Sequence, residues 1–136
     1  MKILIIDDDP SMTDLLSMIL TPTQSEVTCV NNGVSGIRLV KELSPEIVLL
    51  DLMMPEKDGW QTLAEIRKFS SVPILILSVI ENPGIVARAL DEGADDFLVK
   101  PVPRGVLIAH INNLTRRRII QRLENTKLKV TLQSAI

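Results

Sequence analysis

The chain has 136 residues, of which 46% are apolar, so it is long and apolar enough for one domain with a buried core. No apolar run approaches the ~20 residues of a membrane helix, and the apolar start is too short for a signal peptide. The single cysteine, Cys29, excludes an internal disulfide. We therefore expect a cytoplasmic protein without membrane contact, with Cys29 buried as a structural thiol.

The net charge of −2 is spread unevenly along the chain. Residues 1–115 carry 9 basic and 16 acidic side chains, which gives −7, and residues 116–136 carry 6 basic and 1 acidic, which gives +5. This asymmetry predicts a domain over residues 1–115 and a helical basic linker or tail over residues 116–136, which could lead to an effector domain. The tail has no aromatic side chain for base stacking, so we expect no direct nucleic-acid binding.

Strand and helix patterns alternate five times along the chain. Apolar runs predict strands over residues 2–6, 26–30, 46–51, 72–78 and 96–99. Helical spacing predicts helices over residues 10–20, 34–43, 59–69 and 83–92, and from about 104 onward. Asp9 before Pro10 and Asn82 before Pro83 are expected helix caps. Alternation of this kind is typical of an α/β fold with a parallel sheet.

Polar side chains follow the apolar strands at their carboxyl ends. Asp7 and Asp8 follow the first strand, Asp51 the third, Ser78 the fourth and Lys100 the fifth. Parallel strands end at the same edge of the sheet, so these groups should gather in one cleft. Three crowded carboxylates repel one another, and Mg²⁺, or Mn²⁺ as a substitute, would relieve that repulsion. A carboxylate beside a cation, a hydroxyl and an ammonium is suited to accepting a phosphoryl group.

Four motifs occur in the order found in one family, over residues 2 to about 115. They are Ile-Ile-Asp7-Asp8-Asp9-Pro10, Val-Leu-Leu-Asp51-Leu-Met-Met-Pro55 with Asp58-Gly59, Pro73-Ile-Leu-Ile-Leu-Ser78, and Gly93-Ala-Asp95-Asp96-Phe97-Leu-Val-Lys100-Pro101. With them the chain resembles the response-regulator receiver domain of two-component signalling, in the CheY-like superfamily. The resemblance implies a doubly wound, flavodoxin-like α/β fold whose five-stranded parallel sheet has the order 2-1-3-4-5.

The resemblance also implies a metal-dependent phosphoacceptor. Asp51 would be phosphorylated by a sensor histidine kinase, a phosphotransfer protein or a small phosphodonor. Asp8 and Asp51 would bind Mg²⁺ directly, Asp7 would bind it mainly through water, and the backbone carbonyl of Met53 would complete the set. The domain would catalyse only its own phosphotransfer and dephosphorylation, so we do not expect an enzyme.

The remaining family positions imply a switch. Ser78 and Lys100 would contact the phosphoryl oxygens, and Ser78 and Phe97 would move when the group arrives. The face formed by the fourth helix, fifth strand and fifth helix would then change, and a downstream effector domain or protein would read the change. The Lys100–Pro101 peptide bond would be cis.

Three apolar residues depart from the usual pattern around the phosphoacceptor. Val79 stands where the family usually has Ala or Gly, and Met53 and Ile80 are both apolar at positions that influence the hydrolytic water. We therefore expect the phosphoryl group to form slowly and to be long-lived.

A charged surface used for dimerisation in the winged-helix subclass is only partly present. Asp96 is in place, but His110 aligns with the expected Arg and Val106 with an expected acid. The sequence is therefore compatible with a homodimer through this surface but does not predict one. We favour a plain surface position for His110 over a His110–Asp96 contact.

Two other functions remain as alternatives. A haloacid-dehalogenase-type phosphatase would use Asp7 as its nucleophile with Ser78 and Lys100, but it would leave Asp51 idle and needs an acid after the lysine. A receiver-like scaffold would signal without phosphorylation, although the intact carboxylates and Lys100 argue against it.

Overall fold

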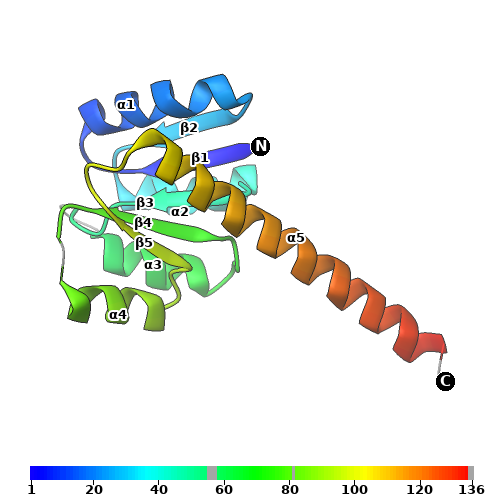
Figure 1. The fold of residues 1–136 in the computed structure, drawn as a ribbon. Helices are drawn as coiled ribbons and strands as arrows, with labels where there is room; N and C mark the ends of the chain where they lie inside the picture. The colour runs from blue at the N-terminus through cyan, green and yellow to red at the C-terminus, as the bar shows by residue number, and fades with distance from the viewer. Residues whose placement is uncertain (55–57, 81, 135–136) are drawn as a thin grey trace.

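The computed structural model describes residues 1–54, 58–80 and 82–134 and folds into a five-stranded parallel sheet with helices on both faces (Figure 1). The strands are β1 (Lys2–Ile6), β2 (Glu26–Val30), β3 (Ile47–Leu50), β4 (Ile74–Ser78) and β5 (Asp96–Val99). The helices are α1 (Pro10–Leu20), α2 (Gly33–Leu43), α3 (Gly59–Arg67), α4 (Pro83–Asp91) and α5 (Arg104–Ser134), with a short 3₁₀ turn at Thr21–Thr23. The strand order is β2-β1-β3-β4-β5, which confirms the expected fold class.

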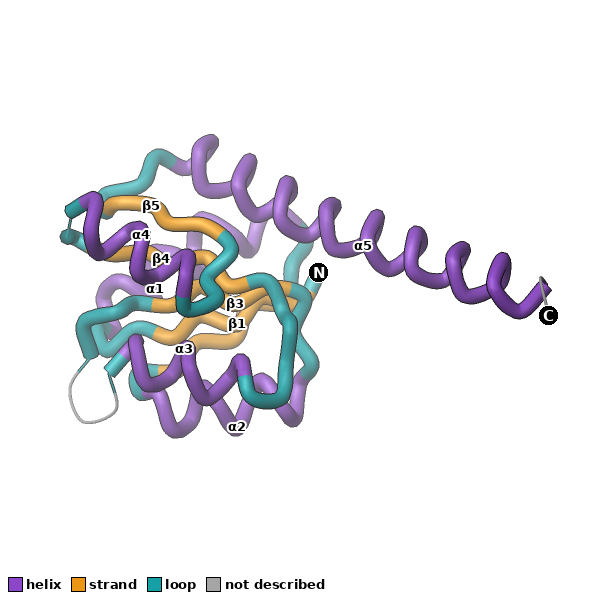
Figure 2. The backbone as a smooth tube through the Cα atoms, turned by 90° about the horizontal axis from the view of Figure 1, so that it is seen from below, coloured by secondary structure: helices purple, strands orange, loops and turns teal. Residues whose placement is uncertain are grey.

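Alternate residues of the inner strands supply two apolar cores. Leu4 of β1 and Leu50 of β3 face one layer, which α2, α3 and α4 cover. Ile5 and Leu49 point the opposite way, toward α1 and α5. A strand residue and its neighbour face opposite sides of a sheet, so a continuous apolar run is what a strand covered on both faces requires. Figure 2 shows the helices on the two sides of this sheet.

Side chains fix most of the helix starts. Asp9 caps α1 with Pro10 at the first helical position, and Asn82 caps α4 in the same way, as predicted. Asp58 and Gln61 form a reciprocal capping box at the start of α3. Pro55, which ends the Asp51 motif, lies outside the described residues.

Two boundaries differ from the prediction by two residues, and the other boundaries of the predicted strands and helices differ by at most one. β4 begins at Ile74 rather than at residue 72, because the N–H of Val72 is taken by the Ser70 hydroxyl and Pro73 has no N–H to donate. α3 ends at Arg67, two residues short of the expected Phe69, where the backbone turns toward β4.

The last helix is much longer than the part that packs on the sheet. α5 has 31 residues, and its buried side chains are Leu107, Ile111, Leu114 and Thr115. Beyond Thr115 the helix extends away from the body as one straight rod (Figure 1). None of the helices in the described part of the chain is long and apolar enough to cross a membrane.

The expectation of a buried cysteine is wrong. Cys29 is exposed, although its Sγ lies 3.6 Å from the backbone carbonyl of Thr13 in α1. The physical reason is its position on β2, an edge strand that is covered less completely than the inner strands of the sheet.

Candidate functional site

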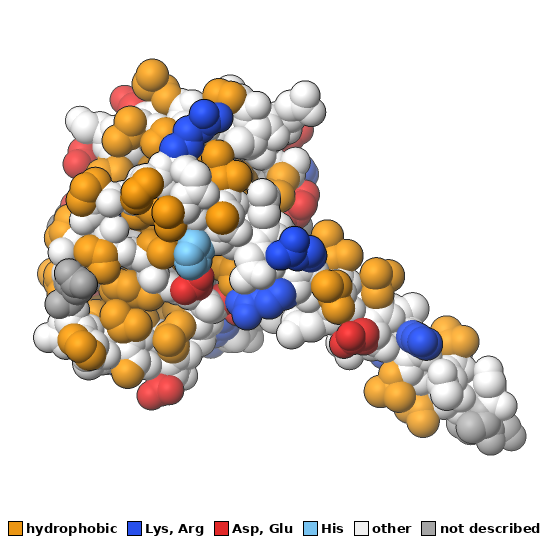
Figure 3. Space-filling model, viewed as in Figure 1, with side chains coloured by type: hydrophobic (Ala, Val, Ile, Leu, Met, Phe, Trp, Pro, Cys, Tyr) orange, Lys and Arg blue, Asp and Glu red, His pale blue; other side chains and the backbone are white. Residues whose placement is uncertain are grey.

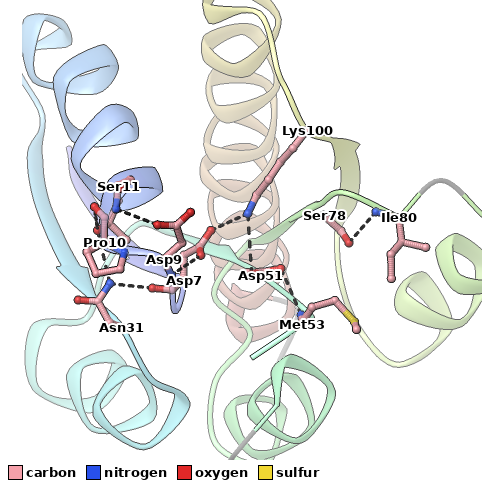
Figure 4. A network of polar contacts seen from close by, with 11 residues as sticks. Asp7, Asp9, Pro10, Ser11, Asn31, Asp51, Met53, Ser78, Ile80 and Lys100 are labelled. Atoms are coloured by element: carbon pink, nitrogen blue, oxygen red, sulfur yellow. Dashed lines mark hydrogen bonds and ion pairs between the residues drawn. The ribbon is translucent and has the colours of Figure 1, made fainter. Parts of the chain in front are cut away.

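The carboxyl end of β1 presents Asp7 and Asp8 at the edge of the sheet. Asp7 is 2% exposed, and its backbone is fixed on both sides: its N–H donates to Val30, and the Asn31 side chain donates to its carbonyl at 2.8 Å. One Asp7 carboxylate oxygen accepts from the backbone N–H of Asp9 at 3.0 Å (Figure 4). The hydrogen bonds of Asp7 with Val30, Asn31 and Asp9 together fix the direction in which its carboxylate points.

Asp51 follows β3 directly beside this position. Its N–H donates to Ile6 of β1 at 3.0 Å, and its side chain accepts from the Met53 N–H at 3.2 Å. Gly59, the first residue of α3, lies against the same backbone: a Cβ there would fall 2.3 Å from the Asp51 carbonyl and 2.2 Å from the Leu52 Cα. The helix can approach this closely only because residue 59 has no side chain.

The structure brings the three predicted carboxylates and the lysine together. Single carboxylate oxygens of Asp7, Asp8 and Asp51 lie within 4.8 Å of one another. The Lys100 ammonium lies 2.6 Å from Asp7 and 3.8 Å from Asp51 (Figure 4). Lys100 follows β5, its N–H donates to the Ser78 carbonyl, and its peptide bond to Pro101 is cis. One positive charge thus faces three negative ones at a single sheet edge.

The pKa of Asp51 is raised to about 6, mainly by burial and to a smaller extent by the charges of Asp7 and Asp8. The Met53 N–H bond and the Lys100 ammonium act in the opposite direction. The donor set is three carboxylates with oxygen ligands only, and its charge exceeds what Lys100 neutralises. These properties fit a hard divalent cation that prefers oxygen ligands.

The other predicted residues of the site differ in exposure. Ser78 is fully buried at the end of β4, and its hydroxyl accepts from the Ile80 N–H at 3.2 Å. Phe97 is partly buried against the core on the α2–α4 side. Met53 and Val79 are strongly exposed, so two apolar side chains border the entrance.

One expectation on this side of the molecule is wrong. The His110 ring nitrogen Nδ1 lies 2.5 Å from an Asp96 carboxylate oxygen, so the pair is formed and His110 is not a plain surface residue. The two side chains are 36% and 30% exposed. Asp96 is the first residue of β5 and His110 lies near the start of α5, so this contact joins the two elements.

Sequence reasoning missed the residue that supports Asp7. The Asn31 amide donates to the Asp7 carbonyl at 2.8 Å and also lies 3.4 Å from the Thr13 hydroxyl. The available signal was its place directly after β2, since β2 pairs with β1 and their ends must be adjacent.

Comparisons with known proteins agree with this geometry. Residues 3–112 match the family described as the response regulator receiver domain. The transcriptional regulatory protein CpxR homolog of Haemophilus influenzae is 41% identical over 116 residues, which are 85% of this chain and 51% of that protein. The DNA-binding response regulator MtrA of Mycolicibacterium smegmatis is 34% identical, with the same two shares. The chain thus spans about half the length of these relatives.

A solved structure is similar over the same region. The BeF3-activated N-terminal receiver domain of RstA from Klebsiella pneumoniae superposes with a TM-score of 0.82 at 28% identity. The match covers 85% of this chain and 99% of that one.

Proposed function

Because the chain belongs to the response-regulator receiver-domain family, as the match over residues 3–112 shows, we propose that Asp51 is the residue that accepts its phosphoryl group. The observation that carries this proposal is the meeting of Asp7, Asp8 and Asp51 within 4.8 Å, with Lys100 against them. In Figure 4, Asp51 lies between Asp7 and Ser78, and the Lys100 ammonium contacts both the Asp7 and the Asp51 carboxylate.

The transfer is a substitution at phosphorus. An Asp51 carboxylate oxygen attacks the phosphorus of a phosphohistidine on the donor, the P–N bond breaks, and the imidazole leaves with the electron pair. Lys100 releases Asp7 and pairs with a phosphoryl oxygen, and the Ser78 hydroxyl donates to another. Ionised Asp51 is the reactive form, because a protonated carboxyl is a poor nucleophile.

A divalent cation, which we propose to be Mg²⁺ with Mn²⁺ as a substitute, would be held by Asp8 and Asp51 directly and by Asp7 through water. The Met53 carbonyl would complete its ligands. When bound it supplies positive charge beside the transferring oxygens. Within this chain, Asn31 and the β1–β3 ladder keep the carboxylates that bind it in register.

Outside the site, the proposal gives the chain a place in a longer signalling route. The donor would be a sensor histidine kinase or a phosphotransfer protein. Phosphorylation would move Ser78 and Phe97 and alter the α4–β5–α5 face. Residues 116–136 would link the receiver domain 1–115 to an effector domain. This agrees with two relatives of about twice the matched length, one named as a DNA-binding response regulator and the other as a transcriptional regulatory protein.

The test uses a small phosphodonor, acetyl phosphate, with and without Mg²⁺. Wild type, Asp51→Asn and Asp7→Asn are incubated, and phosphorylated protein is separated on a phosphate-affinity gel. We expect a retarded, phosphorylated band for wild type only with Mg²⁺. Asp51→Asn should give no such band, and Asp7→Asn should give a weaker one. Turnover of donor by Asp51→Asn together with an inactive Asp7→Asn would favour the phosphatase alternative.

The scaffold alternative makes a different prediction. A scaffold that never takes a phosphoryl group would not bind beryllofluoride, a phosphoryl mimic, in a Mg²⁺-dependent way. Saturable ¹⁹F resonances that require Mg²⁺ and are absent from Asp51→Asn would exclude it.

A further inference from the structure

A second polar hollow lies at the end of the sheet opposite Asp51, where α5 leaves the body. Its volume is about 360 Å³, within the range of small-ligand sites. Its polar and aromatic lining comes from the end of α2 (Lys41, Ser44), from the segment before β4 (Phe69, Ser70) and from α5 (Arg118, Arg122). Figure 3 shows Lys and Arg side chains gathered where the long helix joins the body.

The charged groups that line this hollow all have the same sign. Lys41, Arg118 and Arg122 contribute three positive charges, and among the described residues no carboxylate lines the hollow. The Lys41 ammonium lies 4.8 Å from the centre of the Phe69 ring, a cation–π contact that holds it at the wall. The hydroxyls of Ser44 and Ser70 add donors that can serve an anion.

Arg118 is held in place without a carboxylate of its own. It donates to the backbone carbonyl and the hydroxyl of Ser71, and these are its hydrogen-bond partners within the described ranges. Because burial and the nearby charges of Arg122 and Arg67 act together, the pKa of Arg118 is lowered. Asp95 opposes this shift, but its carboxylate is bound by Arg67 at 2.9 Å.

We propose that this hollow binds the diphosphate group of a small ligand. Three cations and two hydroxyls on three separate segments can contact more oxygens than a single phosphate offers, and a diphosphate carries the charge that would match them. The diphosphate could be free inorganic diphosphate or part of a nucleoside diphosphate. The site is separate from Asp51 and does not depend on the function proposed for it.

Such a ligand would join the tail to the body. Arg118 and Arg122 belong to α5, whereas Lys41 and Ser44 lie at the end of α2 and Ser70 lies in the segment before β4. A bound diphosphate would cross-link these segments and restrain the direction in which α5 leaves the domain.

The test is calorimetric titration of the full chain in Mg²⁺-free buffer with inorganic diphosphate, inorganic phosphate and ADP. We expect diphosphate to bind about tenfold more tightly than phosphate. Arg122→Ala and Lys41→Gln should each weaken diphosphate binding about tenfold. Arg116→Ala removes the same charge from the same helix outside the hollow, so it should leave binding within about twofold. The amide resonances of Ser44 and Ser70 should shift on titration.

Several outcomes would overturn the proposal. They are equal affinities for phosphate and diphosphate, equal losses in Arg122→Ala and Arg116→Ala, or shifts confined to the Lys100 region. If ADP binds more tightly than diphosphate, the ligand is a nucleotide, and if the two bind equally, the diphosphate group alone is recognised. Arg122 is exposed, so its variant should fold, and circular dichroism checks this.

Discussion

Lys100 donates a charge-assisted hydrogen bond to Asp7 at 2.6 Å, across 93 positions of sequence. Both side chains are almost fully buried. The same ammonium is 3.8 Å from Asp51, so its main partner in this structure is Asp7. In the proposed phosphotransfer, Lys100 would therefore have to exchange a carboxylate partner for a phosphoryl oxygen.

Replacing Lys100 should destabilise the fold, because the crowded carboxylates then lose the positive charge that offsets their repulsion. Lys100→Gln leaves the buried Asp7 charge without its partner, so we expect a loss of about 3 kcal/mol in the free energy of unfolding, measured with urea in Mg²⁺-free buffer. Arg38→Gln breaks an exposed 3.9 Å pair with Glu42 and should cost less than about 0.5 kcal/mol. Equal losses in the two variants would show that the buried Lys100–Asp7 pair stabilises the fold no more than an exposed ion pair does.

Asp51→Asn should stabilise the metal-free protein in a pH-dependent way. The folded state raises the pKa of Asp51 to about 6, so the folded protein holds this proton more tightly than the unfolded chain does. The penalty for ionising Asp51 is therefore absent below about pH 4, grows between about pH 4 and 6, and stays constant above about pH 7. Above about pH 7, the free energy of unfolding of Asp51→Asn should therefore exceed that of wild type by about 2 kcal/mol.

Urea unfolding of the two proteins from pH 4 to pH 8 measures this gap. Asp91→Asn, which changes an exposed carboxylate at the end of α4, gives the comparison for a simple charge effect. A gap between wild type and Asp51→Asn that is flat across the whole range would mean that Asp51 has an ordinary pKa.

The apolar mouth of the site should control the phosphoryl lifetime. Met53 and Val79 are 55% and 69% exposed, and Ile80 follows the buried Ser78. We expect decay of the phosphorylated wild type well beyond seconds, faster decay in Ile80→Glu because a carboxylate can orient water, and faster loading in Val79→Ala. Val34→Glu on α2 is the exposed control. A lifetime of seconds that Ile80→Glu does not change would contradict this expectation.

Gly59 should be required for the position of Asp51. A Cβ at residue 59 meets backbone atoms, which cannot rotate away, so Gly59→Ala should cost about 2–3 kcal/mol in the free energy of unfolding and slow phosphorylation. Gly105 has no atom within 4 Å of the same added group, so Gly105→Ala should be neutral or stabilise α5 by up to about 1 kcal/mol. Equal effects of the two changes would mean that the close approach at Gly59 is not a constraint.

Local chemistry explains why most of the fold was predictable. Asp9–Pro10 and Asn82–Pro83 mark helix starts by satisfying free N–H groups within a few residues. The run from Ile47 to Leu50 is apolar on both faces, so it had to be a covered strand. The strand order came from the family resemblance, because many orders are compatible with the same alternation of strands and helices.

Contacts between distant side chains were not predictable in the same way. The partner of Lys100, the contact of His110 with Asp96 and the exposure of Cys29 depend on how neighbouring elements meet. Sequence patterns fix which face of an element is apolar, but they do not fix distances of a few ångströms across the sheet. The sequence therefore predicted that the residues of the site lie at one edge of the sheet, but it did not predict which side chains pair with each other.

The most direct test of the account is chemical mapping of the phosphorylated residue. Protein loaded with acetyl phosphate and Mg²⁺ is reduced with borohydride, which converts an aspartyl phosphate to homoserine, and is then digested and sequenced by mass spectrometry. We expect homoserine at Asp51 and at neither Asp7 nor Asp8. Homoserine at Asp7, or phosphorylated protein in which Asp51 stays intact, would contradict it.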